Sequence, residues 1–323
     1  MRIVSATPSV KMELHQEIKR LAKTKNAVIL AHNYTLPEVQ EVADVVGDSL
    51  QLAQAAAKTD AAIIVLCGVH FMAETAALLN PDKKVLIPDL EAGCSLADTI
   101  NAEQLRAWKA EHPGAVVVSY VNTTAEVKAE SDICCTSSNA VAVVQSIPPD
   151  KEILFCPDLF LGSYVKKVTG RQNMHIWLGE CHVHAGIKPE TIAAARQARP
   201  GSDFLIHPEC GCITHCLDFL AHGQVDAANT HVLSTSGMLR HARQAPGPDF
   251  VVATEVGMLY PLQKENPEKR FYPVDPEASC RYMKMMSLEK IHKSLTDEIF
   301  AVTVPPQTAA KARLAVQRML EIA

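Results

Sequence analysis

The sequence predicts three similar parallel-sheet α/β domains in a pseudo-threefold arrangement, with the active site at their junction. Two observations predict this fold: short apolar runs alternate with helical patterns along the whole chain, and the alternation recurs about every 88 residues. Strands that alternate with helices form parallel sheets, and ligands bind at the carboxyl ends of such strands. A chain of 323 residues is also long enough for more than one hydrophobic core.

The first strand of each repeat follows a helical pattern and ends in polar residues. Helical patterns near 10–24, 102–111 and 189–197 precede apolar runs at 26–34, 115–123 and 203–210. The polar residues at the ends of these runs recur at separations of 88 and 87 residues: His32, Tyr120 and His207. Two residues beyond each of them lies a second polar side chain: Tyr34, Asn122 and Glu209.

Two further strands follow in each repeat, and one cysteine follows the last of them. We expect second strands at 62–68, 132–138 and 231–237, and third strands at 84–89, 152–158 and 249–255. The cysteines after the third strands are Cys94, Cys181 and Cys280. Helical segments near 277–294 and 306–322 are expected to return to the first domain. The predicted domains are therefore 1–88 with 276–323, 89–175, and 176–275.

The composition excludes several classes of protein. Hydrophobic residues make up 48% and charged residues 21% of the chain. The formal net charge is −5 and the sequence contains no block of basic residues. This charge pattern argues against nucleic-acid binding. No apolar run is long enough to span a membrane. The N-terminal residues lack the apolar core of a signal peptide, so we expect a cytoplasmic protein.

Ten cysteines are many for a reducing compartment, and they indicate metal binding or catalysis rather than disulfides. Three cysteines from three domains could bind zinc, hold an iron–sulfur cluster, or have no common role. A cubane cluster takes four thiolates when fully ligated. With three thiolates, one iron keeps an open coordination position and can act as a Lewis acid. The His, Tyr, Asn, Ser, Thr and Glu residues at the strand ends are suited to acid–base chemistry and anion binding.

Five segments together resemble the motifs of the quinolinate synthase family: residues 31–50, 120–140, 157–162, 207–210 and 234–238. The resemblance covers nearly the whole chain. It implies one 4Fe–4S cluster with three cysteine ligands at the junction of three α/β domains. It also implies condensation of iminoaspartate with dihydroxyacetone phosphate to quinolinate, phosphate and water in de novo NAD biosynthesis. Because iminoaspartate is labile, functional coupling to an L-aspartate oxidase is expected.

The resemblance also implies roles for individual residues. The cluster ligands would be Cys94, Cys181 and Cys280, and the catalytic residues Tyr34, Glu209 and His184. The substrate-binding residues would be His32, Ser49, Tyr120, Asn122, Ser137, His207, Glu209, Ser234 and Thr235, with Ser234 and Thr235 holding the phosphate. Ser49 could instead only cap a helix. His182 and His184 are two residues apart, so we expect only His184 to face the cluster.

The remaining cysteines have less defined roles. The segment 209–224 departs from the simplest family members, and Cys210, Cys212 and Cys216 with His215 could hold zinc or a second cluster, or could be oxidisable neighbours of the site. We favour a variant surface or lid segment, because their spacing does not match the common zinc patterns. We expect the other cysteines to be packing residues: Cys67, Cys134, Cys135 and Cys156.

Three other functions compete with this interpretation. Another 4Fe–4S hydro-lyase acting on a hydroxy acid would share the open iron but would not need the hydroxyl residues at 234–235. A metal-storage or structural protein would carry thiols without convergent His, Tyr and Glu residues. A radical enzyme that uses S-adenosylmethionine would need a compact Cys-x-x-x-Cys-x-x-Cys motif, which the sequence lacks.

Overall fold

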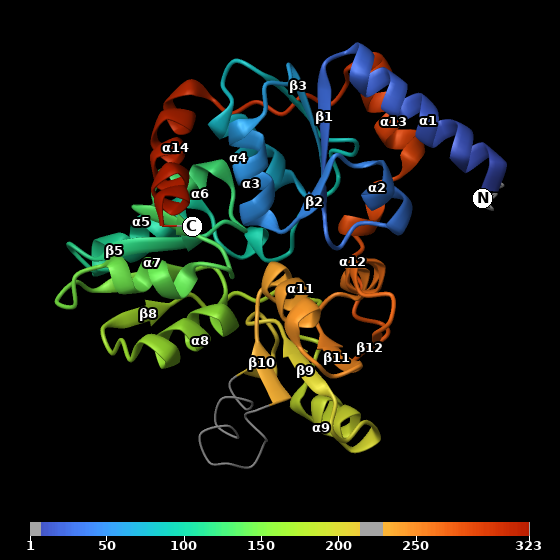
Figure 1. The fold of residues 1–323 in the computed structure, drawn as a ribbon. Coiled ribbons are helices and arrows are strands. Elements are labelled where there is room, and N and C mark those ends of the chain that lie inside the picture. The colour runs from blue at the N-terminus through green and yellow to red at the C-terminus, as the bar shows by residue number, and fades with distance from the viewer. Residues whose placement is uncertain (1–7, 214–228, 323) are drawn as a thin grey trace.

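The computed structural model describes residues 8–213 and 229–322, and these residues form three four-stranded sheets. Each sheet is parallel throughout and has the same strand order: β2-β1-β3-β4, β6-β5-β7-β8 and β10-β9-β11-β12. We call the sheets with their helices units 1, 2 and 3 (Figure 1). The predicted fold class of three similar parallel-sheet α/β domains is confirmed.

The helices and strands alternate regularly along the chain. Unit 1 contains α1 Pro8–Thr24, β1 Ala27–His32, α2 Pro37–Val42, β2 Val45–Gly47, α3 Ser49–Lys58, β3 Ile63–Cys67, α4 His70–Leu79 and β4 Lys84–Leu86. Unit 2 contains η1 Ala97–Thr99, α5 Ala102–Glu111, β5 Val116–Tyr120, α6 Ala125–Ala129, β6 Ile133–Cys135, α7 Ala140–Ser146, β7 Ile153–Cys156, α8 Leu159–Thr169 and β8 Met174–Ile176.

Unit 3 and the C-terminal helices complete the described chain. Unit 3 contains α9 Pro189–Ala198, β9 Asp203–Ile206, β10 Thr230–Val232, α11 Thr235–Gln244, β11 Asp249–Ala253, η3 Val256–Met258, α12 Leu259–Glu265 and β12 Arg270–Pro273. The C-terminal segment adds η4 Met283–Met285, α13 Leu288–Asp297 and α14 Pro306–Glu321. None of the helices in the described residues is both long enough and apolar enough to cross a lipid bilayer.

Each unit has four strands rather than the three that the sequence predicted. The predicted strand at 62–68 is β3, the third strand of unit 1, whereas 132–138 and 231–237 contain β6 and β10, which are equivalent to β2. The prediction missed β2, β8 and β12. Because β2 and β8 have only three residues each, neither shows a measurable period. Each of the three cysteines therefore follows a fourth strand.

The central strands form because their side chains are apolar on both faces of each sheet. The sequences of β1, β3 and β5 are AVILAH, IIVLC and VVVSY, and β3 is buried throughout. Such runs are typical of parallel strands that helices cover on both sides. In unit 1, α1 and α13 pack together on one side of the sheet and α3 and α4 on the other (Figure 1).

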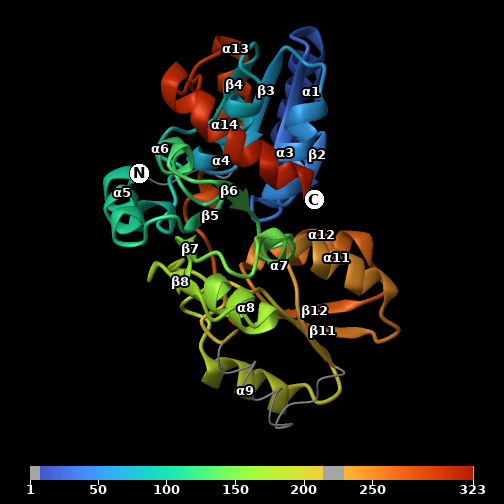
Figure 2. The same ribbon diagram turned by 90° about the vertical axis from the view of Figure 1, so that its left-hand side faces the viewer.

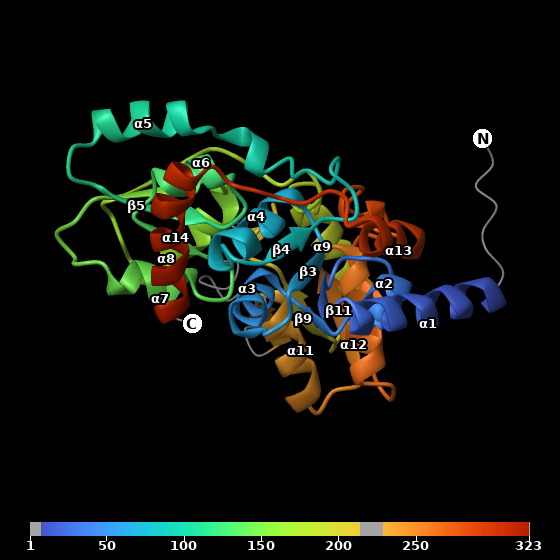
Figure 3. The same cartoon turned by 90° about the horizontal axis from the view of Figure 1, so that it is seen from above.

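The two C-terminal helices return to the N-terminal half of the molecule. Helix α13 packs against α1 and β3, as the sequence predicted. Helix α14 contacts α4 of unit 1 and also α6 and β6 of unit 2 (Figures 2 and 3). The Asn139 side-chain amide of unit 2 donates to the Met319 carbonyl of α14 at 3.1 Å. Helix α14 therefore joins units 1 and 2, a contact that the sequence did not indicate.

Candidate active site

The carboxyl ends of the strands from all three units line one cavity. Among the predicted site residues, all except Ser234 line it: His32, Tyr34, Ser49, Cys94, Tyr120, Asn122, Ser137, Cys181, His184, His207, Glu209, Thr235 and Cys280. These residues come from equivalent places in the three units, after the first, second and fourth strands. The strand order brings the three sets together, because the same edge of every parallel sheet faces the junction.

Equivalent hydrogen bonds hold the three cysteine loops. In each unit, a backbone N–H beyond the third strand donates to the carbonyl two residues before the cysteine: His70 to Ala92 at 2.8 Å, Leu159 to Gly179 at 2.8 Å, and Val256 to Ala278 at 2.9 Å. The cysteine carbonyl then accepts from the residue four positions later: Cys94 from Asp98 at 3.1 Å, Cys181 from Ala185 at 2.9 Å, and Cys280 from Lys284 at 3.1 Å. Each cysteine therefore begins a helical turn.

Glycine is required in one of these loops because the chains approach closely. A Cβ atom at Gly179 would overlap the Pro157 carbonyl and the Thr99 side chain. At this short distance the Gly179 amide donates a hydrogen bond to the Pro157 carbonyl at 3.1 Å. The glycine that precedes the Cys181 motif thus allows the loop to pack against the end of β7.

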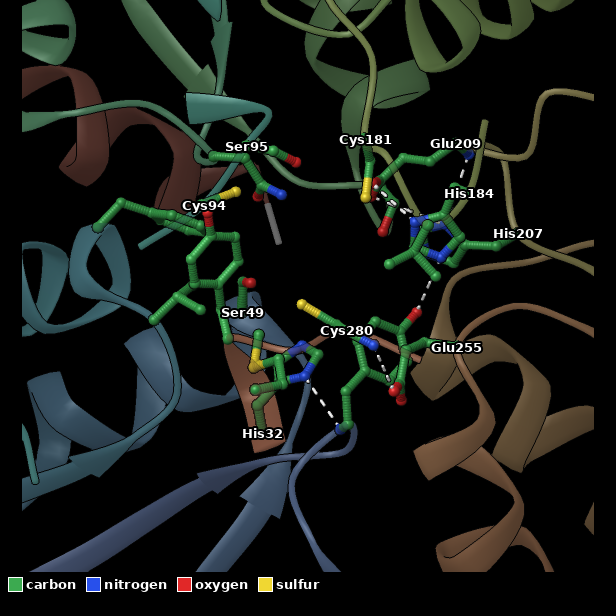
Figure 4. A pocket seen from close by; sticks show the side chains of 18 of the residues that line it. His32, Ser49, Cys94, Ser95, Cys181, His184, His207, Glu209, Glu255 and Cys280 are labelled. Carbon is green, nitrogen blue, oxygen red and sulfur yellow. Dashed lines mark hydrogen bonds and ion pairs between the residues drawn. The ribbon is translucent and has the colours of Figure 1, made fainter. Parts of the chain in front are cut away.

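The three cysteine sulfur atoms face the same open centre (Figure 4). Burial raises the pKa of the Cys94 thiol to about 12, and backbone N–H groups of Leu96 and Ala97 oppose this effect. Burial likewise raises the pKa of Cys280, opposed by equivalent N–H groups of Met283 and Tyr282. N–H groups directed at sulfur stabilise a thiolate, and a coordinating thiol is deprotonated. The loops are therefore suited to hold metal-bound thiolates.

Glu209 is the centre of a buried group of polar side chains. Its Oε1 accepts a hydrogen bond from the Tyr120 hydroxyl, and its Oε2 lies 3.4 Å from His184 Nδ1. Burial alone would raise the pKa of Glu209, but His184, His207 and Tyr120 outweigh burial and lower the pKa to about 2. Glu209 is therefore ionised at neutral pH. The ligand atoms of Cys181, His184 and Glu209 lie within 4.8 Å of one another, so these residues could hold a metal ion.

His184 carries the proton next to this carboxylate. Burial alone would lower the pKa of His184, but Cys181 and Glu209 outweigh it and raise the pKa to about 10. His184 Nε2 lies 2.9 Å from Thr254 Oγ1, and that same hydroxyl lies 2.6 Å from the Tyr34 hydroxyl. Burial raises the pKa of Tyr34 well above its usual value. The cavity therefore holds two protonated groups, His184 and Tyr34, that Thr254 links.

His32 and His207 occupy equivalent positions and have the same hydrogen-bond pattern. The Tyr34 amide donates to His32 Nδ1 at 3.2 Å, and the Glu209 amide donates to His207 Nδ1 at 3.4 Å. Burial lowers the pKa of His32 to about 4 and that of His207 to about 3. Both rings are therefore neutral at neutral pH, and each carries its proton on Nε2, since Nδ1 accepts.

Hydroxyl groups follow the second strand of each unit: Ser49, Ser137 and Thr235. Ser49 does not cap its helix, because α3 is capped by Asp48 in a capping box with Gln51. The alternative that Ser49 serves only as a helix cap is therefore wrong. In unit 3 the cap of α11 is Ser234, whose hydroxyl accepts from the Gly237 amide at 3.2 Å. Thr235 is thus the member of the predicted pair that lines the cavity.

A network of polar side chains beside these hydroxyls joins the three units. Asp48 Oδ2 accepts from Ser138 Oγ at 2.9 Å and from Ser236 Oγ at 2.7 Å. The Asn33 side-chain amide donates to Thr235 Oγ1 at 3.0 Å. Four residues of this network were not predicted from the sequence: Asp48, Ser138, Ser236 and Asn33. Their positions in the sequence could have indicated them, because each is adjacent to a predicted site residue.

Glu255 is a fifth residue of the site that the sequence did not predict. It is buried and lines the cavity at the end of β11. Its Oε1 accepts from the Cys280 amide at 3.0 Å and pairs with Lys284 Nζ at 2.8 Å, and its Oε2 accepts from the Gly257 amide at 2.7 Å. Lys284 also donates to the Tyr34 carbonyl. The carboxylate therefore holds the start of the Cys280 loop, a role that its position at a strand end could have suggested.

The other cysteines of the described residues lie outside this group. Four cysteines are buried in β3, β6 and β7 and do not line the cavity, as expected for packing residues: Cys67, Cys134, Cys135 and Cys156. Cys210 and Cys212 are buried in unit 3, are joined by a disulfide and do not line the cavity. For this pair the expectation of a surface segment without disulfides is therefore wrong. His215 and Cys216 lie outside the described residues. His182 also lines the cavity, contrary to the expectation that only His184 faces it, but its side chain is exposed and its Nδ1 lies 2.6 Å from Ser95 Oγ. His184 is buried beside Glu209.

Comparison with known proteins gives one consistent result. Residues 16–321 match the family model described as Quinolinate synthetase A protein. The chain is 58% identical over 306 residues to the quinolinate synthase of Mycobacterium sp. strain KMS, covering 95% of this chain and 91% of that protein. It is 57% identical over 309 residues to a quinolinate synthase of Thermus thermophilus, covering 96% of this chain and 97% of that protein.

Proposed function

Because this chain belongs to the quinolinate synthetase A family, we propose that it is a quinolinate synthase of NAD biosynthesis. It condenses iminoaspartate with dihydroxyacetone phosphate and releases quinolinate, phosphate and water. The observation that carries the proposal is the convergence of Cys94, Cys181 and Cys280 from equivalent loops on one cavity, beside the ionised carboxylate of Glu209.

The donor set of the cavity fits a 4Fe–4S cluster. Three thiols from equivalent loops line the cavity, and no fourth cysteine among the described residues lines it. Backbone N–H groups directed at Cys94 and Cys280 suit the thiolate form of both residues. We therefore assign Cys94, Cys181 and Cys280 as the ligands of one 4Fe–4S cluster. The bound cluster supplies an iron with an open coordination position that can act as a Lewis acid.

Three side chains are in protonation states suited to moving protons. Condensation followed by loss of two waters requires protons to be removed from carbon and nitrogen and delivered to leaving oxygens. The ionised Glu209 serves as general base, and the protonated His184 and Tyr34 serve as proton donors. The Tyr120 hydroxyl, which donates to Glu209 Oε1, orients the carboxylate.

The substrates carry negative charge, yet no lysine or arginine of the described chain lines the cavity. Hydroxyls and the N-termini of helices supply the complementary partial charge instead. Thr235 begins α11 and holds the phosphate, while Ser234 caps that helix and fixes its first turn. Ser49 at the start of α3, together with Ser137 and Asn122, holds the carboxylates of iminoaspartate. The neutral rings of His32 and His207 donate through Nε2 to substrate oxygens.

The cellular setting follows from the chemistry of the substrate. Iminoaspartate is labile, so a cytoplasmic location with functional coupling to an L-aspartate oxidase completes the proposal.

Anaerobic purification with iron and sulfide analysis, followed by an assay for quinolinate, tests the proposal. We expect about four irons and four sulfides per chain and quinolinate from the two substrates. Cys94→Ala, Cys181→Ala and Cys280→Ala should each lose the cluster, whereas the buried controls Cys134→Ala and Cys156→Ala should keep it. A variant among the first three with a full cluster would remove that residue from the ligand set, and a clustered wild type without quinolinate formation would refute the activity.

A further inference from the structure

A second group of possible metal ligands lies in unit 3, apart from the cavity. Asp203 is the first residue of β9, His231 lies in the middle of β10, and His241 lies on α11. One ligand atom of each lies within 4.8 Å of the others, and none of the three residues lines the cavity. The three side chains are 16 to 24% exposed, so the group is accessible to an ion but largely shielded from bulk water.

The geometry of this group leaves one nitrogen atom without a partner. His241 Nε2 lies 2.9 Å from Asp203 Oδ2, a normal hydrogen-bond distance, whereas His231 Nε2 lies 3.9 Å from that oxygen. The two imidazole rings are close, with centroids 3.8 Å apart. His231 Nε2 is buried, and no atom of the described residues forms a hydrogen bond with it. Buried nitrogens normally have a partner, so this unpartnered nitrogen points to a ligand.

We propose that Asp203, His231 and His241 form a site for a divalent transition-metal ion of the zinc type. Zn²⁺ binds histidine nitrogen and carboxylate oxygen at about 2.0–2.2 Å, so neighbouring ligand atoms in a tetrahedral site lie about 3.3 Å apart. The distances of 2.9 and 3.9 Å to Asp203 Oδ2 straddle this value. Shifts of roughly half an ångström would bring both histidine nitrogens to this spacing from Asp203 Oδ2, and water would occupy the fourth position.

The protonation state of His231 supports metal binding at neutral pH. Burial and the neighbouring His241 lower the pKa of His231, so its imidazole is neutral and offers a lone pair. Asp203 adds one negative charge against the divalent ion. A bound ion would also connect β9, β10 and α11. Since His241 lies six residues beyond Thr235, about 9 Å along α11, the ion would hold the helix whose first turn borders the cavity.

A similar group on unit 2 has no unpartnered nitrogen and serves as the control. His175 Nε2 lies 2.6 Å and His112 Nδ1 3.3 Å from the same oxygen of Glu152. Both nitrogens therefore face their carboxylate at hydrogen-bond distance, and this group is satisfied without an ion. We do not assign a metal to it.

Equilibrium dialysis of the anaerobic holoenzyme against Zn²⁺ tests the site, with zinc and iron counted together so that loss of the cluster is recognised. We expect the wild type and the His175→Gln control to bind one zinc ion with the same affinity. The variants His231→Gln, His241→Gln and Asp203→Asn should bind this ion at least tenfold more weakly, with unchanged iron content. Equal zinc binding by all five proteins, or no binding by the wild type, would overturn the proposal.

Chemical modification of the wild type provides a test that does not depend on the folding of variants. Diethyl pyrocarbonate acylates accessible imidazoles, and peptide mapping locates the modified residues. Zn²⁺ should protect His231 and His241 at least tenfold, while His112 and His175 keep their rate of modification. Protection of His112 and His175 instead would transfer the site to unit 2 and refute the assignment to unit 3.

Discussion

Replacing Glu255 by glutamine should loosen the Cys280 loop without removing any atom that contacts the cluster. The buried carboxylate accepts from the Cys280 amide and from Lys284 on one oxygen, and from the Gly257 amide on the other. Glutamine has the same shape but a single acceptor oxygen. Its amide nitrogen must therefore face either Gly257 N–H or the donors Cys280 N–H and Lys284.

The size of the effect follows from these contacts. At least one hydrogen bond to a charged acceptor is lost, which is worth about 1.5–3 kcal/mol, and a donor is forced against another donor in a buried place. The Glu255–Lys284 pair, whose carboxylate side chain is 0% exposed, also loses its charge attraction. We expect the free energy of unfolding to fall by about 3 kcal/mol. With a slope of about 3 kcal/mol per molar urea, the midpoint of unfolding should fall by about 1 M.

Two measurements with a surface control check this expectation. The control is Glu265→Gln, which breaks the pair between Glu265 and Arg243, whose side chains are 35% and 56% exposed. Such a pair contributes about 0–1 kcal/mol, so its urea midpoint should fall by less than about 0.3 M. Iron release to a chelator under anaerobic conditions should be roughly tenfold to a hundredfold faster in Glu255→Gln than in the control. Equal midpoints and equal rates of iron release in the two variants would refute the argument that Glu255 holds the Cys280 loop.

Three further predictions concern side chains in the cavity. Glu209→Gln and Tyr34→Phe should keep the cluster, measured as iron content, but lower kcat about a hundredfold to ten-thousandfold; near-normal turnover would assign the proton transfers elsewhere. Thr235→Val should weaken the apparent affinity for dihydroxyacetone phosphate about tenfold to a hundredfold, from loss of ~1.5–3 kcal/mol, with little effect on iminoaspartate; the opposite ranking would place the dicarboxylate at α11. Because burial lowers the pKa of His32 from 6.5 to about 4, the unfolded state takes up this proton first as the pH falls below 6.5. Wild type should therefore lose about 1.3 kcal/mol of stability relative to His32→Gln between pH 7.5 and 5.5, measured by urea unfolding; parallel pH profiles would contradict a neutral, buried His32.

The sequence by itself determined the fold class and most of the candidate site. The long apolar runs of β1, β3, β5 and β9 and the polar residues at their ends were readable, because strand burial and strand-end polarity are local properties. The repeat then aligned His32 with Tyr120 and His207, and it separated Cys94, Cys181 and Cys280 from the packing cysteines. A repeat can be recognised without knowing the contacts, since equivalent positions recur in the same order and at similar spacings.

Short edge strands were decided only by the tertiary structure. The sequences of β2 and β8 carry no periodic signal in three residues, and their partner strands alone define them. Because β2 was not predicted, β3 of unit 1 was aligned with β6 and β10, which are equivalent to β2. The three cysteines were still aligned correctly with one another. Helix α14 similarly shows an apolar stripe in the sequence, but only packing reveals that the stripe contacts both α4 and α6.

The partners of the polar side chains also depend on the tertiary structure. The sequence presents Glu255, Asp48 and Thr254 only as residues next to strand ends or hydroxyl motifs. Their roles come from contacts across 25 to 220 positions, such as Glu255 with Cys280 and Tyr34 with Thr254. Hydrogen bonds and pKa shifts depend on distance and burial, which the chain acquires only when the three units meet. The sequence therefore determined which chemical groups reach the junction, and the tertiary structure decided which of them hold protons and which hold the loops.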